Sequence, residues 1–330
     1  MTIVVGYLPA KGGRACLDLA SLLARSGSSE PVAVVTVVPA SWSTPSMAKV
    51  DAEFAAWAQE EGDKALATAG EYLAAKWPDV EASFHRAEGR SVPSALTETA
   101  EQLAADLLVL GSSTDGRVGQ VIVGSTAEPL LHSSEIPVAI APRGYRAPSA
   151  SKIGRLTCSY SGIDDDVDLV TATAQLSVRM GCPLRIATFG VRGRTMYPPR
   201  VGLHAEDLVL AQWKTQVQSD QRGCLEQLTT LGLTTELTTT AVATGSRWDE
   251  AMDDLEWESG EVLVVGSSRV GRLARVFLGS KAIKIVRYSP VPVVVVPAAI
   301  AAEIADDAIA DADAGDVDAG DVEPAGEARR

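Results

Sequence analysis

The sequence predicts an α/β protein made of two tandem domains, each built on a doubly wound, five-stranded parallel sheet. Short apolar runs alternate with amphipathic helical stretches, a pattern that favours parallel strands joined by right-handed crossovers. Runs such as DLLVLG and EVLVVG are almost continuously apolar, as strands buried on both faces are. The whole order of elements then occurs a second time, and 330 residues are enough for two domains with separate cores.

The first half contains five apolar runs separated by four helical stretches. The stretch 46–77 is long and amphipathic, Pro78 follows it, and the run after that proline is the weakest strand of the five. We expect strands at 2–6, 31–38, 82–86, 106–111 and 136–142, and helices at 13–25, 46–77, 93–105 and 125–133.

The second half repeats this order. We expect strands at 155–160, 183–190, 235–243, 262–266 and 291–297, and helices at 164–179, 204–231, 248–257 and from 280 onward. The segment GYRAPSAS (144–151) reads as a linker. The predicted organisation is a first domain at 1–145, a linker at 146–152, a second domain at 153–298 and a tail at 299–330.

The tail holds much of the acidity of the chain. The formal net charge is −14, of which the segment from Glu303 onward carries −8, leaving −6 on the rest. The tail is rich in Ala, Asp and Gly and lacks aromatic residues, so we expect it to be disordered, apart from a short helix near 298–310. An acidic chain without a basic stripe is a poor match for nucleic acid or an anionic membrane.

No apolar run reaches the roughly 18 residues that a membrane-spanning helix needs. The N-terminus lacks a basic segment followed by an apolar signal region, so the sequence predicts a cytoplasmic location without membrane insertion. The four cysteines form no C-x-x-C pair and the three histidines are isolated. We therefore expect buried reduced thiols and no structural metal.

Two loops contain the candidate ligand-binding residues of the sequence. GSSTDGRVGQVIVGS (111–125) and GSSRVGRLARVFLGS (266–280) each follow an apolar strand and end in Gly-Ser, at a constant offset of 155 residues. In a doubly wound sheet, ligands bind beyond the carboxyl ends of the strands, and a helix N-terminus there attracts anions. The alternative is purely structural, because glycine allows a tight turn and serine caps helices.

The spacing of these loops resembles the G-x-x-G-x9-G-[ST] nucleotide loop of the universal stress protein family. The strands PVAIAP and PVVVVP that follow are also similar to those of the family, and the resemblance spans 2–143 and 155–297. It implies a Rossmann-like, adenine nucleotide α-hydrolase-like fold that binds ATP or a related adenine nucleotide. The residues carried over are Gly266, Ser267, Ser268, Arg269, Gly279, Ser280 and Lys281 in the second half, and Gly111, Ser112, Ser113, Gly124, Ser125 and Thr126 in the first.

The chain departs from the family pattern at four positions. Thr114 and Arg269 stand where the middle glycine belongs, and Leu8 and Ser161 replace an aspartate that meets the adenine end of the nucleotide. Losing a charged hydrogen bond costs about 1.5–3 kcal/mol of binding free energy. The second loop is the more cationic, since it carries Arg269, Arg272, Arg275 and Lys281, so we favour the second domain as the nucleotide site.

The resemblance implies a binding or regulatory module of the stress response. It also implies that the two domains pair through their last strands, 136–141 and 291–296, with a homodimer and an unidentified protein partner as further expectations. The sequence shows no catalytic constellation, so we do not predict turnover as the function. Two alternatives stay open, namely a ligand-free scaffold that acts through protein contacts and a weak ATPase.

Overall fold

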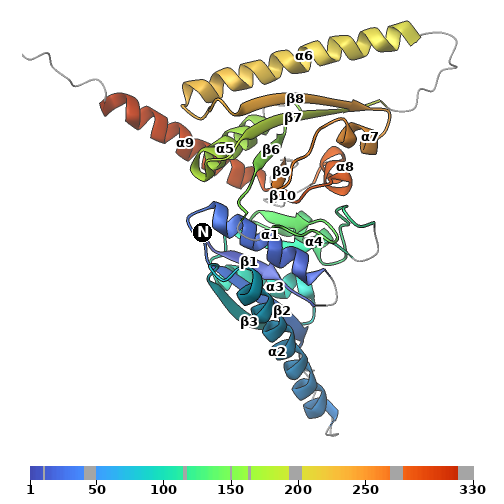
Figure 1. The fold of residues 1–330 in the computed structure, drawn as a ribbon, viewed down its shortest axis with the longest axis vertical. Coiled ribbons are helices and arrows are strands. Elements are labelled where there is room, and N and C mark those ends of the chain that lie inside the picture. Colours follow the sequence, from blue (N-terminus) through green and yellow to red (C-terminus); the bar gives the residue numbers. More distant parts are fainter. Residues whose placement is uncertain are drawn as a thin grey trace, which may run out of the picture.

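The structure is a computed structural model that describes residues 1–9, 12–40, 50–113, 117–148, 151–162, 165–192, 203–267 and 278–318. Its ten described strands form one sheet in the order β3-β2-β1-β4-β5-β10-β9-β6-β7-β8 (Figure 1). Within each half all neighbouring strands are parallel, which confirms the predicted fold class.

The elements of the first half follow the predicted order. They are β1 (Ile3–Gly6), α1 (Gly13–Ser26), β2 (Val32–Pro39), α2 (Val50–Lys76), β3 (Ala82–Gly89), α3 (Val92–Gln102), β4 (Leu107–Gly111), α4 (Ala127–Ser133) and β5 (Val138–Ala141).

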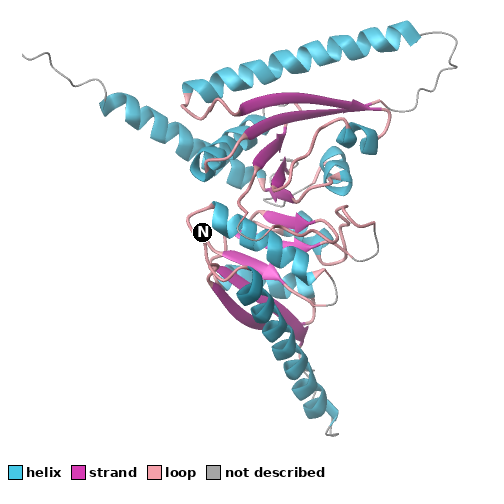
Figure 2. Cartoon of the chain, in the orientation of Figure 1, coloured by secondary structure: helices cyan, strands magenta, loops and turns pink. Residues whose placement is uncertain are grey.

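The second half repeats the same series and adds a helix at its end (Figure 2). Its elements are β6 (Arg155–Ser159), α5 (Asp165–Met180), β7 (Leu184–Val191), α6 (Leu203–Thr230), β8 (Thr238–Gly245), α7 (Trp248–Asp253), β9 (Glu261–Gly266), α8 (Ser280–Tyr288), β10 (Val293–Val296) and α9 (Ala298–Asp318).

The sheet has a hydrophobic layer on each face. Successive strand residues point to opposite faces, so Ile3 and Val5 of β1 join one buried cluster and Val4 joins the other. The first cluster takes in α1, α2, α5 and α6, and the second takes in α3, α4, α7 and α8. Helices on both faces explain why the strand sequences are apolar throughout rather than alternating.

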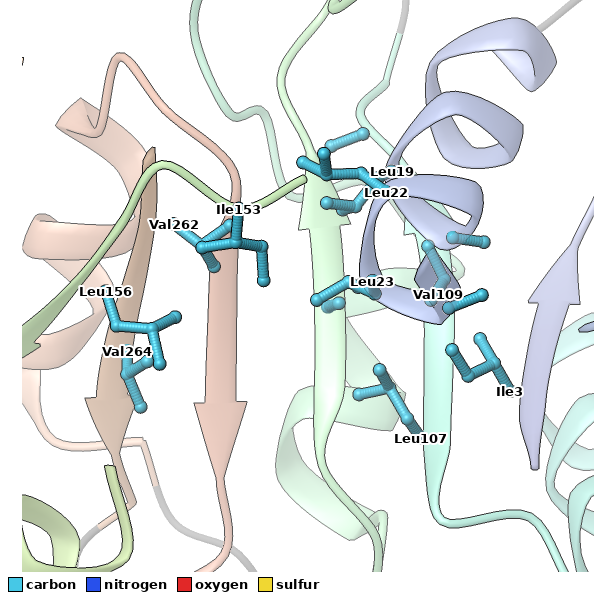
Figure 3. Packing of buried hydrophobic residues seen from close by; sticks show 14 of the residues in the cluster. Ile3, Leu19, Leu22, Leu23, Leu107, Val109, Ile153, Leu156, Val262 and Val264 are labelled. Carbon is cyan, nitrogen blue, oxygen red and sulfur yellow. The ribbon is translucent and has the colours of Figure 1, made fainter. Parts of the chain in front are cut away.

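The two halves meet at the centre of the sheet. β5 and β10, the last strands of the two halves, pair antiparallel, with Ala139 opposite Val294. The first cluster continues across this junction, from Leu23 and Leu107 to Ile153 and Val264 (Figure 3). The continuous core makes the two halves one packed unit.

The segment expected as a linker packs on α1. Ala147 and Ile153 are buried, and the Ile153 amide donates a hydrogen bond to the Ser26 hydroxyl at 2.8 Å. The predicted domain boundaries at 145, 152 and 298 stay a prediction, because packing of this kind marks no sharp limit.

The C-terminal segment differs from the expectation. We predicted a short helix at 298–310 followed by disorder, whereas α9 extends to Asp318 and packs on α5. Ala301, Ala305 and Ala308 recur at helical spacing and are buried. Alanine has the highest helix propensity and loses no side-chain entropy on burial, so a weakly amphipathic helix can still dock. Residues 319–330 lie outside the described residues.

Across the described ranges, no helix is long and apolar enough to cross a membrane. In the same part of the chain, no group of three or more His, Cys, Asp or Glu side chains is arranged to hold a metal ion. All four cysteines are buried and unpaired. Burial raises the pKa of the Cys16 thiol to about 12 and that of Cys224 to about 11, so these thiols are neutral near pH 7.

Candidate functional site

A pocket of about 370 Å³ lies at the carboxyl ends of the strands of the second half. Ser159 of β6, Thr188 of β7 and Val265 of β9 line its floor. This is the edge at which doubly wound sheets bind ligands. The volume falls within the range of about 300–1,000 Å³ that small-molecule sites occupy.

One side of the pocket is suited to an anion. Gly266, Ser267, Gly279, Ser280 and Lys281, all predicted from the sequence, line it together. Ser280 begins α8, and the first amides of an α-helix have no partner within the helix. Lys281 in the first turn adds a positive charge where the helix dipole already favours anions.

The backbone at Gly279 leaves room for a ligand. A Cβ atom placed on Gly279 would meet no described atom within 4 Å, and φ at this residue is −59°, which any residue can adopt. Among the described residues, nothing packs against this face of Gly279, which lines the pocket.

Aromatic side chains also line the pocket. Tyr160, Phe189, Trp213 and Trp248 line it. Trp213 reaches the pocket from α6, and its indole lies over Gly190 near the end of β7, where a Cβ would approach the ring to 2.3 Å. Glycine at this position is therefore required for the ring to lie so close to the strand.

An acidic group borders the pocket as well. The Ser161 amide donates to Asp166 Oδ2 at 2.7 Å, and the Ser161 hydroxyl donates to the same oxygen. Asp166 lies in the first turn of α5, so these bonds hold the loop after β6 against that helix. Ser161 occupies the position at which the family pattern has an aspartate.

In the corresponding corner of the first half, the described residues of the loop bond one another. Ser112 is buried, its hydroxyl oxygen accepts a hydrogen bond from the Ile122 amide at 2.6 Å, and it donates to the Ile122 carbonyl at 3.2 Å. The Ser113 amide also donates to the Ile122 carbonyl, at 3.0 Å. Both hydrogen-bonding capacities of the Ser112 hydroxyl are thus used within the loop.

The helix after this loop is also less suited to an anion. α4 has only seven residues and carries Glu128 in its first turn, where α8 carries Lys281. A Cβ on Gly124 would lie 3.2 Å from the Ser113 Cβ, so the two ends of the loop are in contact. Ser125 is exposed and Thr126 makes no capping bond. The structure brings the predicted first-half residues together, and the described ones contact and bond one another.

Several residues named from the sequence fall outside the described residues. These are Ser268, Arg269, Arg272 and Arg275 in the second loop and Thr114 in the first. Gly111, at the end of β4, is described and leads directly into the first loop.

Known proteins similar to this chain agree with the repeat. The family model described as "Universal stress protein family" matches residues 1–142 and 161–297. The chain belongs to the universal stress protein family. Universal stress proteins of Mycobacterium tuberculosis and Mycobacterium bovis are each 46% identical to it over 297 residues, which is 90% of this chain and 100% of each relative.

Solved structures share the fold of this family member. A universal stress protein from Archaeoglobus fulgidus superposes with a TM-score of 0.56 at 16% identity, covering 90% of this chain and 98% of its own. A protein of unknown function from Pseudomonas aeruginosa gives a TM-score of 0.53 at 13% identity, covering 93% and 96%. At such low identity these likenesses show the arrangement of two tandem domains and nothing about ligands.

Sequence reasoning missed the aromatic side of the site. Trp213 and Trp248 lie on helices far from the glycine loop in sequence, and no motif marks them. The one local signal is Gly190 near the end of an otherwise apolar strand, because a glycine there indicates a close approach. Asp166 belongs to the acidic run Asp164–Asp166 of the sequence, but its bond to Ser161 depends on how α5 begins.

Proposed function

We propose that the second domain binds ATP or a related adenine nucleotide, and that the protein acts as a binding or regulatory module of the stress response. The observation that carries the proposal is the pocket itself, which is lined both by Ser267, Ser280 and Lys281 and by Trp213 and Trp248. A nucleotide has the matching parts, because its phosphates suit helix amides and lysine and its base suits aromatic rings.

The changes at the family motif do not remove this complementarity. The aspartate missing at Ser161 leaves that serine bonded to Asp166, so a carboxylate still borders the pocket. Turnover is not part of the proposal, because the Ser161–Asp166 bond holds the loop after β6 against α5 and no histidine lines the pocket among the described residues.

The first domain is proposed to lack this ligand. Its loop serine is bonded within the loop, and its helix begins with an acidic residue, Glu128. A single nucleotide per chain is the resulting expectation, with about one equivalent of ATP bound at saturation.

The test begins with protein purified without denaturant. Heat denaturation followed by mass spectrometry of the released small molecules identifies any bound nucleotide, and calorimetric titration measures ATP affinity. Gly279→Val places side-chain atoms in the open space beside α8, so ATP affinity should fall by about tenfold or more while stability stays close to that of the unaltered protein.

The matched control is Gly124→Val in the first half. It should leave ATP affinity unchanged and lower stability, since the new side chain meets Ser113. Equal losses of affinity in both variants would remove the preference for the second domain. Absence of both co-purified nucleotide and a heat signal up to millimolar ATP would refute nucleotide binding altogether.

A further inference from the structure

The appended helix α9 begins at the pocket. The Ala298 amide, at the start of α9, donates a hydrogen bond of 3.1 Å to the Ser267 hydroxyl oxygen. Ser267 also lines the pocket, on the side suited to an anion. A single hydroxyl therefore joins the candidate site to a helix that starts directly after residue 297, where the match to the family model ends.

The bond from Ala298 leaves Ser267 able to donate toward a ligand. A serine hydroxyl has one proton to donate and two lone pairs to accept. Ala298 occupies one lone pair, and toward the described part of the chain the Ser267 hydroxyl donates no bond. Fixing the oxygen in this way orients the remaining O–H, and a preorganised donor binds an anion with a smaller loss of entropy.

The rest of α9 is held by α5 (Figure 1). Ala301, Ala305 and Ala308 form its buried face, whereas Ala310 is exposed. α5 itself begins at the pocket, where Asp166 bonds the loop after β6. Docked α9 thus touches the site twice, directly through Ser267 and indirectly through the helix that carries Asp166.

We propose that docked α9 positions Ser267 for the anionic part of the ligand, and that ligand binding in turn stabilises the docking of α9 on α5. This coupling rests on the proposed function of the second domain. Coupling between two sites is reciprocal, so the factor by which docking strengthens binding equals the factor by which binding strengthens docking. Ser267 is the positioning residue, and the extent to which α9 docks on α5 depends on whether the pocket is occupied.

The experiment compares two glutamate substitutions on the same helix of the full-length protein. Ala305→Glu places a charge on the buried face and undocks α9, while Ala310→Glu adds the same charge on the exposed face. In calorimetric titration with ATP, Ala305→Glu should bind about fivefold more weakly and Ala310→Glu as tightly as the unaltered protein.

A double-variant cycle assigns the coupling to Ser267. Ser267→Ala alone should weaken ATP binding, Ser267→Thr should restore it because the hydroxyl is retained, and Ala305→Glu should have no further effect in the Ser267→Ala background. A fivefold loss that persists in that background would overturn the role of Ser267.

Hydrogen exchange on the unaltered protein supplies a measurement that needs no variant to fold. Saturating ATP should slow exchange of the α9 amides about fivefold, by reciprocity, and leave the amides of α3 in the first half unchanged. Exchange in α9 that does not respond to ATP, or equal ATP affinities of the two glutamate variants, would overturn the coupling and leave nucleotide binding standing. No ATP binding by the unaltered protein would overturn the proposed function and this coupling with it.

Discussion

The two halves of this molecule fold alike and differ at the corner where a ligand would bind. In the first half, Ser112 uses its hydroxyl to bond Ile122 within the same loop. In the second half, the equivalent Ser267 accepts the Ala298 amide, its one side-chain hydrogen bond among the described residues, and lines a pocket. A duplicated motif therefore retains the same backbone turn, whereas the hydrogen-bond partners of its second residue, a serine, differ between the two halves.

A second pair of positions shows the same divergence. The seventh residue of β2 is Val38, which faces Gly62 of α2. The seventh residue of β7 is Gly190, which faces Trp213 of α6. The bulky partner is on the strand in one half and on the helix in the other. Only the second arrangement places an aromatic ring at the wall of a pocket.

The largest effect should come from reversing the charge at the start of α8. Lys281→Glu replaces a cation with an anion beside the helix N-terminus, so ATP affinity should fall by about a hundredfold, the upper end of what a charged hydrogen bond contributes. Titration calorimetry measures this loss. Lys64→Glu on the exposed surface of α2 makes the same change of charge far from the pocket and should leave affinity unchanged at moderate salt. An equal loss in both variants would mean that net charge, and not the corner, attracts the nucleotide.

An intermediate effect should separate the two serines. Ser112→Ala leaves the half-buried Ile122 amide without its acceptor, so the free energy of unfolding should fall by about 1–3 kcal/mol while ATP affinity stays constant. Urea unfolding measures the first quantity and calorimetry the second. Ser267→Ala should show the reverse pattern, with weaker ATP binding and a smaller loss of stability. Identical behaviour of the two variants would contradict the distinction between the two corners.

The smallest expected effect is that of the buried thiols on the free energy of unfolding, which changes only above neutral pH. Burial raises the pKa of Cys16 to about 12 and that of Cys224 to about 11, from an ordinary value of 9.0. The folded state therefore retains protons that the unfolded state releases above pH 9, so this stability is complete below about pH 9 and is lost as the pH rises through the folded values.

Urea unfolding at pH 7, 9 and 10 measures this dependence, and Cys16→Ala should make the decline shallower. At pH 8 all four native thiols should react with iodoacetamide far more slowly than the thiols of urea-unfolded protein. Rapid alkylation of the native protein would show that a thiol is accessible and contradict the buried assignment.

The sequence by itself determined the repeat, the order of strands and helices, the fold class and the membership of the family. These features depend on local patterns, because apolar runs and helical periodicity mark the elements and a constant offset of 155 residues marks the duplication. The glycines and serines of the two loops were likewise found from their spacing. The shared Gly-Ser-Ser and Gly-Ser at the ends of both loops mark the same turn, and only the greater positive charge of the second loop favoured the second domain.

The tertiary structure alone decided how the two corners differ, because each decisive contact joins residues that are distant in sequence or placed by packing. Trp213 reaches the pocket only because α6 crosses the sheet above Gly190, and Ser267 meets Ala298 only because β9 and β10 lie side by side. The docking of α9 also arose from packing, since alanines that carry little hydrophobic signal fit closely against α5. Composition predicted only a short helix near 298–310 with disorder beyond it, whereas α9 extends to Asp318 and packs on α5.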